Sequence, residues 1–203
     1  SLFSLTYTSE NVSLLPSLIN TLIMTLVSLA IAAPVGIFAA IFLVEYAKKG
    51  SRFVKLIRIT AETLSGIPSI VYGLFGMLFF VTALHWGMSL LSGALTMVIM
   101  VLPLIMRTAE EALKSVPDSY REASFGLGAG KLRTIFTIVL PSAVPGILAG
   151  VILAIGRVVG ETAALLYTSG TVAAVPNSLM GSGRTLALHM YVLSSEGLHV
   201  CLL

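Results

Sequence analysis

The feature that most limits how this chain can fold is an apolar run from Ser17 to Val44 that carries no charged side chain. About 20 apolar residues in a helix cross the hydrocarbon core of a bilayer. Backbone groups inside a bilayer must also form their hydrogen bonds within the chain, which favours a helix. The run therefore predicts a membrane-spanning helix. Pro34 and Gly36 interrupt it, as spanning helices tolerate when neighbouring groups satisfy the freed backbone.

Three further apolar runs predict spans at about 64–84, 90–106 and 135–166. Charged residues make up only 10% of the chain, whereas soluble domains contain about 25%. We therefore expect an all-α integral membrane protein, a polytopic helical bundle that forms a single domain over residues 1–203. A single cysteine excludes a disulfide framework, and the three histidines are too dispersed to predict a metal site.

The basic residues indicate the orientation of these spans. Ten of the twelve lysines and arginines lie in two connectors, 45–62 and 107–133. Cytoplasmic loops of membrane proteins carry an excess of lysine and arginine, so we expect both connectors in the cytoplasm and residue 1 outside. The tract 167–196 contains a single basic residue, Arg184. We expect this tract to be an outward loop with partial helix.

A short polar segment lies between the third and fourth predicted spans. Three residues together have the composition of a helix start, namely Ser115, Pro117 and Asp118. Glycines at 126, 128 and 130 predict its end, because glycine tolerates the backbone angles of a sharp exit. A helix at about 116–130 is too short to cross a bilayer. We expect it to lie at the cytoplasmic surface, where it is available for docking.

The same segment resembles the EAA loop of ABC importer permeases. The resemblance is carried by seven residues at the spacing of that motif: Glu122, Ala123, Ser124, Gly128, Ile138, Leu140 and Pro141. Ser124 departs from the motif, which has alanine at its third position. The resemblance implies that the helix at 116–130 is a coupling helix that sits in a cleft of a cytoplasmic ATPase subunit.

Two charges interrupt the apolar body of the fourth predicted span, Arg157 and Glu161. They are one helical turn apart, so they can share a face and form an ion pair. Charges inside a membrane are costly unless they are paired or face a cavity. Two interpretations remain open. The pair is either a structural staple between helices, or Arg157 lines an anion path and is held by Glu161 when substrate is absent.

Two further segments resemble the permeases of phosphate-uptake (Pst) ABC importers, most closely the subunit type PstA. These are Glu62–Gly76, with the core G-I-P-S-I-V-Y-G-L-F-G, and the run G-R-V-V-G-E-T-A-A-L-L that begins at Gly156. The resemblance implies the MetI-like permease fold and a role for Arg157 in phosphate passage. Such permeases have one more helix at either end, so we expect this chain to be truncated at both ends.

The resemblance also implies the assembly in which the chain works. The chain would be the transmembrane permease subunit of an ATP-driven phosphate importer and would form half of the translocation path in the cell membrane, as a multi-pass protein. Its partners would be ABC ATPase subunits, a homologous permease subunit, an extracytoplasmic phosphate-binding protein, phosphate and membrane lipid, with no nucleic acid.

We expect the chain to be a transport subunit and not an enzyme, with no cofactor of its own, because ATP and Mg²⁺ would be bound by the partner ATPase. Gly126–Lys131 has the glycine content of a phosphate-binding loop, but Leu132 stands where that loop has Ser or Thr.

Four alternatives differ from this prediction in cargo or in class. In the first alternative the chain is a permease for another solute such as sulfate or molybdate. In the second it is the sister PstC-type subunit. In the third it is a membrane enzyme or sensor that uses Arg157 and Glu161, and in the fourth it is a packing protein without a transport role. The absence of a catalytic constellation disfavours the enzyme, and the EAA spacing disfavours the packing protein.

Overall fold

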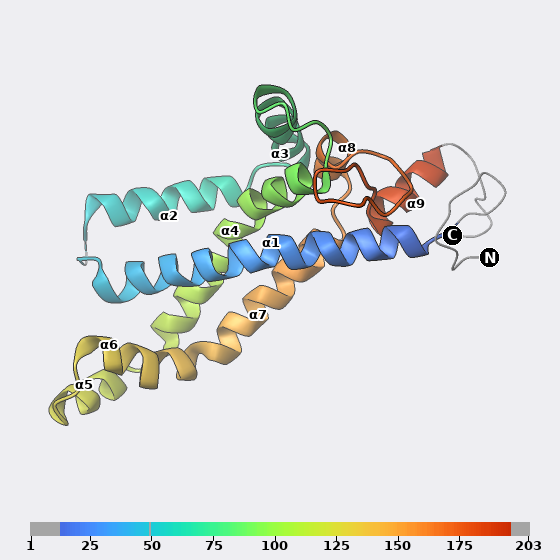
Figure 1. Ribbon diagram of the computed structural model, residues 1–203. Helices are drawn as coiled ribbons and strands as arrows, with labels where there is room; N and C mark the ends of the chain where they lie inside the picture. Colours follow the sequence, from blue (N-terminus) through green and yellow to red (C-terminus); the bar gives the residue numbers. More distant parts are fainter. Residues whose placement is uncertain (1–12, 49, 196–203) are drawn as a thin grey trace. The chain divides into compact units, whose positions relative to one another are not determined.

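The computed structural model describes residues 13–48 and 50–195, and every regular element in this part is a helix (Figure 1). Contacts divide the chain into two units. The first comprises residues 1–30, 67–100 and 155–203, and the second comprises 31–66 and 101–154. Residue 1, Lys49 of the first basic connector and the last residue of the tract 167–196 lie outside the described residues.

The described elements follow one another in this order along the chain: α1 (Leu15–Ile41), the π-helix η1 (Phe42–Tyr46), α2 (Arg52–Ser65), α3 (Ser69–Gly76), the π-helix η2 (Met77–Ala83), α4 (Leu90–Ser115), α5 (Asp118–Gly126), α6 (Lys131–Thr134), the π-helix η3 (Ile135–Val139), α7 (Leu140–Val159), α8 (Ala163–Thr168) and α9 (Leu186–Ser195).

Three helical stretches are long and apolar enough to cross a membrane, at Leu15–Tyr46, Leu90–Ser115 and Lys131–Val159. The number rises to four if α2 and the stretch Ser69–Ala83 are counted as one broken span. The all-α membrane class predicted from the apolar runs is therefore confirmed. Three predicted bounds differ from the helices. The second predicted span, 64–84, begins at Ser69, because α2 ends at Ser65 and a break separates the two helices.

The third predicted span, 90–106, corresponds to α4. This helix continues to Ser115 and includes the charged residues of its last turns. The fourth predicted span, 135–166, is not one helix. It ends at Val159, and a short separate helix, α8, begins at Ala163.

The core of the second unit forms where α4 packs closely on α7. A Cβ added to Gly146 would lie 2.7 Å from the Ala112 Cβ, and one added to Gly150 would overlap the Thr108 side chain. Small residues thus allow the two helices to approach closely, as they do in membrane helix pairs. The buried side chains around this contact come from α1, η1, α2, α4, η3 and α7 and include Ile41, Val54, Leu113, Ile135 and Val139.

The second glycine pair of α7 does not act in the same way. A Cβ on Gly156 meets no atom of the described residues within 4 Å, and one on Gly160 meets only the Gly156 carbonyl oxygen of its own helix. The sequence spacing G-x-x-x-G is the same in both pairs. Within the described residues this spacing marks a close helix contact at Gly146 and Gly150 and none at Gly156 and Gly160.

The first unit is organised around the contact of α3 with α8. A Cβ on Gly73 would lie 2.8 Å from the Ala164 Cα, so only glycine permits this approach. Asn20 of α1 donates from Nδ2 to the carbonyl oxygens of Ala174 (3.0 Å) and Arg184 (3.2 Å). These bonds fasten the first turns of α1 to the segment that follows α8.

We predict that Gly150→Ala destabilises the protein, whereas Gly156→Ala does not. Overpacking a tight contact costs ~1–3 kcal/mol. Alanine at the open Gly156 position instead gains helix propensity of up to ~1 kcal/mol. The measurement is the free energy of unfolding, or the midpoint of thermal unfolding, of the purified protein in detergent. Equal midpoints for the two variants would contradict the assignment of Gly150 to the α4–α7 contact.

Candidate functional site: the coupling segment and the charges after α7

The helix predicted at 116–130 is α5, which is shorter and begins at Asp118. Pro117 occupies its N-cap position, and no side chain caps it. The predicted role of Ser115 in starting this helix is wrong. The Ser115 hydroxyl donates to the Ala112 carbonyl oxygen at 2.8 Å, within the last turn of α4. Ser115 therefore ends one helix, and proline sets the direction in which the next one begins.

Gly128 ends α5 in the manner predicted from the glycines. Its φ of +82° lies in the left-handed region that favours glycine. The Gly128 amide donates to the Phe125 carbonyl oxygen (2.9 Å), and the Ala129 amide donates to the Ser124 carbonyl oxygen (3.1 Å). These two bonds form a Schellman exit and satisfy carbonyl groups that the helix end leaves free. No described atom lies within 4 Å of a Cβ at Gly128, so backbone conformation, and not space, requires the glycine.

Ser124, the departure from the EAA motif, has a structural partner. Its hydroxyl forms a 2.8 Å hydrogen bond with the Thr134 hydroxyl, and both side chains are buried. The bond joins α5 to α6 across the glycine turn. Alanine at this position has no group to form the bond, so the serine adds a tie that the motif residue would lack.

Beside α5 the surface contains a hollow of about 480 Å³. It is lined by Tyr120, Ala123, Ser124, Leu127, Gly128, Ala129, Arg133, Thr137 and Ile138. Four of the seven EAA residues thus meet at one hollow, and Glu122 lies exposed on the same helix. Leu140 and Pro141 are not in the lining and begin α7. Leu127 is 89% exposed, which is an unusual position for an apolar side chain with no role in a core.

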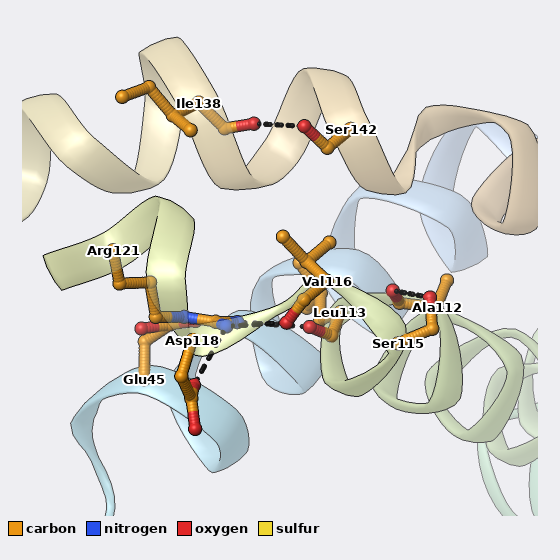
Figure 2. Close-up of polar contacts among 9 residues, drawn as sticks. All are labelled: Glu45, Ala112, Leu113, Ser115, Val116, Asp118, Arg121, Ile138 and Ser142. Atoms are coloured by element: carbon orange, nitrogen blue, oxygen red, sulfur yellow. Dashed lines mark hydrogen bonds and ion pairs between the residues drawn. The ribbon is translucent and has the colours of Figure 1, made fainter. Parts of the chain in front are cut away.

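Arg121 is the site residue that sequence analysis missed (Figure 2). Its Nε and Nη2 donate to Glu45 Oε1 at 3.1 and 2.9 Å, and its Nη1 donates to Asp118 Oδ1 at 3.1 Å. Nη1 also donates to the Val116 carbonyl oxygen (2.8 Å), and Nη2 donates to the Leu113 carbonyl oxygen (3.0 Å). The Arg121 side chain is only 13% exposed.

This network ties three elements together. The carbonyl oxygens of Leu113 and Val116 belong to the end of α4, where helices leave carbonyl groups without intrahelical partners and favour a positive charge. Glu45 belongs to η1, the continuation of α1. The guanidinium of Arg121 therefore holds α5 to the ends of α4 and η1. No local pattern signals this role, because Glu45 is 76 residues away in the sequence.

The two charges of the fourth predicted span are not joined. Among the described residues no ion pair links Arg157 to Glu161, so the expected pairing is wrong. The cause is the end of α7 at Val159, which removes the continuous helix that the pairing needs. Glu161 is buried, and its Oε1 accepts a hydrogen bond from the Ala164 amide of α8 at 3.2 Å.

Arg157 is half-buried and interacts electrostatically with the hydroxyl of Tyr72, a buried residue of α3. Tyr72 lies in the segment G-I-P-S-I-V-Y-G-L-F-G but was not singled out from the sequence. The first unit thus brings Arg157, Tyr72 and Glu161 to the region where the end of α7, α3 and α8 meet.

We predict that Arg121→Lys releases α5 even though it keeps the charge. Lysine lacks the planar fork that reaches Glu45 and the two carbonyl groups at once. Hydrogen bonds to charged groups contribute ~1.5–3 kcal/mol each, so amides of Asp118–Gly126 should exchange with deuterium about tenfold faster or more. Arg133→Lys is the control, because the exposed Arg133 side chain forms no hydrogen bond or ion pair within the described residues. Unchanged exchange in Arg121→Lys would show that the network does not hold α5.

Comparisons with known proteins give one consistent result. The family described as "Binding-protein-dependent transport system inner membrane component" matches residues 32–195. The chain is 36% identical over 194 residues to the probable ABC transporter permease protein YqgI of Bacillus subtilis, covering 89% of this chain and 66% of that protein. It is 42% identical over 154 residues to the phosphate transport system permease protein PstA 1 of Mycobacterium tuberculosis, covering 76% and 50%. The chain therefore spans between half and two thirds of these relatives.

Among solved structures, a chain of the MetNI methionine ABC transporter in an inward-facing conformation has a similar fold. The TM-score is 0.67, with coverage of 92% of this chain and 80% of that chain. The sequence identity is 18%, so the likeness concerns the fold. The predicted permease fold of the MetI-like type is confirmed.

Proposed function

This chain belongs to the family of binding-protein-dependent transport system inner membrane components, and we propose that it is the transmembrane permease subunit of an ATP-driven phosphate importer. The observation that carries the proposal is the 42% identity over 154 residues to a phosphate transport system permease, in a chain that has the fold of an ABC importer permease. The chain itself would carry out no catalysis and hold no cofactor, since ATP and Mg²⁺ would bind to a separate ATPase subunit.

The relatives favour phosphate over the other cargoes. A further relative, from Mycoplasma pneumoniae, is 38% identical over 182 residues and is also a phosphate transport system permease, a PstA homolog. Sulfate and molybdate, the alternative cargoes, have no such support. The same names favour the PstA-type subunit over its PstC-type sister. The partners under this proposal are ABC ATPase subunits, a homologous permease subunit and an extracytoplasmic phosphate-binding protein.

The coupling role rests on α5 and the turn after it. Glu122, Ala123 and Leu127 are exposed, and the hollow beside them is lined by EAA residues. An exposed leucine next to a hollow is a suitable contact for a partner that covers both. Movement of the ATPase would reach α5 first. Arg121 would then transmit this movement to the ends of α4 and η1, because four hydrogen bonds resist the separation of α5 from these elements.

The role proposed for Arg157 is to attract the anion within the membrane. Its guanidinium is half-buried and has no carboxylate partner among the described residues, so its charge remains available. A guanidinium binds phosphate oxygens with two parallel hydrogen bonds. The role proposed for Glu161 is not to hold Arg157. Glu161 would fix the start of α8, which packs on α3.

We predict that Leu127→Ser weakens binding of the ATPase subunit while the permease remains folded. Burial of a leucine side chain contributes ~1.5–3 kcal/mol, which corresponds to about tenfold or more in the dissociation constant. Leu56→Ser is the matched control, because Leu56 is a 61% exposed leucine of α2 outside the EAA segment. The measurement is ATPase association and stimulated ATP hydrolysis in the reconstituted complex. Equal values for parent and Leu127→Ser would contradict the docking role of this surface.

We predict that Arg157→Ala abolishes ATP-dependent phosphate uptake in vesicles that hold the complete importer, while assembly and basal ATP hydrolysis persist. Arg157→Lys should retain only part of the uptake, because an ammonium group does not form the bidentate bonds of a guanidinium. Uptake of sulfate and molybdate in the same vesicles tests the cargo. Normal phosphate uptake by both variants would remove Arg157 from the anion path.

A further inference from the structure

A second hollow of the second unit lies beside the basic connectors and shares no lining residue with the 480 Å³ hollow beside α5. Its volume is about 860 Å³. It is lined by η1 and the turn after it, by α2, and by the end of α4 with α5 and the first residue of α6. The lining includes five cationic side chains, those of Lys48, Arg58, Lys114, Arg121 and Lys131.

Three of these cations already face carboxylates. Arg121 bonds to Glu45 and Asp118, which are the two acidic residues of the lining. Arg58 and Lys114 both contact Oε1 of the buried Glu110, at 2.6 and 2.7 Å. Because one carboxylate serves two cations, this second group keeps a positive charge. Arg58 and Lys114 are 43% and 50% exposed, so their remaining N–H donors are accessible from the hollow.

The remaining two cations have no carboxylate partner among the described residues. Lys48 and Lys131 are both exposed. The Lys131 ammonium group lies 4.8 Å from the ring centre of Tyr46, a cation–π contact that keeps it at the wall of the hollow. The lining cations exceed their carboxylates, with Glu110 counted, by two charges. The hollow therefore has the charge to receive a dianion.

A neighbouring hollow of about 180 Å³ shows the contrast. It shares Arg58 and Lys114, and its lining also contains Arg107, Glu62, Glu110 and Glu111. Its three cations are matched by three carboxylates. Arg58 and Lys114 belong to both hollows, so the unpaired cations that are particular to the larger hollow are Lys48 and Lys131.

We propose that the 860 Å³ hollow is a binding site for a phosphate group, supplied either by inorganic phosphate or by the headgroup of an anionic phospholipid. Arginine and lysine donors bind phosphate oxygens with strong charge-assisted hydrogen bonds. Basic pockets between membrane helices on the cytoplasmic side bind anionic headgroups. The site is built from the second unit alone and does not include Arg157, so it stands whatever the cargo of the importer is.

The test uses the assembled importer in phosphatidylcholine nanodiscs. One arm measures equilibrium binding of radiolabelled inorganic phosphate at constant ionic strength against chloride. The other arm measures the number of phosphatidylglycerol molecules retained, by native mass spectrometry. Each arm compares the parent with K48Q, K131Q and the double variant K48Q/K131Q. K55Q is the control, because Lys55 is an exposed lysine of α2 outside the lining. R157A separates this site from the proposed anion path.

We expect one probe to bind the parent and to bind K48Q/K131Q about tenfold more weakly, with smaller losses in the single variants and full binding in K55Q. Binding that remains in R157A belongs to this hollow and not to the proposed anion path. Loss confined to the phosphatidylglycerol arm identifies a lipid headgroup as the source, and loss confined to the other arm identifies inorganic phosphate. The proposal is overturned if the parent binds neither probe, or if K55Q loses as much binding as K48Q/K131Q. Loss of phosphate binding in R157A alone would also overturn it.

Discussion

The guanidinium of Arg121 is the interaction on which the cytoplasmic connectors depend. It provides five hydrogen bonds from one nearly buried side chain to Glu45, to Asp118 and to two carbonyl groups at the end of α4. A buried cation is costly unless its donors are satisfied, and here carboxylate and carbonyl oxygens satisfy them. The same bonds satisfy carbonyl groups that α4 leaves without partners. One residue thus ends α4, starts the packing of α5 and joins both to η1.

Such a clamp suits a helix that has to transmit movement. α5 has only nine residues, so its own hydrogen bonds contribute little stability in water. Its position depends on contacts at both ends, Arg121 near the start and the Ser124–Thr134 bond with the Gly128 exit at the finish. Between these ties the exposed residues of α5 are free to contact another protein. A helix held at both ends, followed by the exposed apolar residue Leu127, would be the physical basis of the proposed coupling role.

The charges of the first unit follow a different arrangement. Glu161 bonds to the backbone of α8, and Arg157 has no carboxylate partner among the described residues. If the two charges paired with each other, the positive charge of Arg157 would be neutralised. The break after Val159 prevents this and directs Glu161 to a structural bond. A positive charge kept in a membrane protein without a paired carboxylate is a site where an anion is attracted.

The sequence by itself determined the class of the protein, its helical runs and the EAA segment, because length, hydropathy and glycine placement act locally along the chain. It did not predict the partners of Arg121, since Glu45 lies 76 residues away. It also did not separate Gly150 from Gly156, which share one spacing but differ in whether α4 packs against them. The pairing of Arg157 with Glu161 failed because α7 ends at Val159, between the two charges. Long-range packing alone decided which charges meet, and with them which charges remain available to bind an anion.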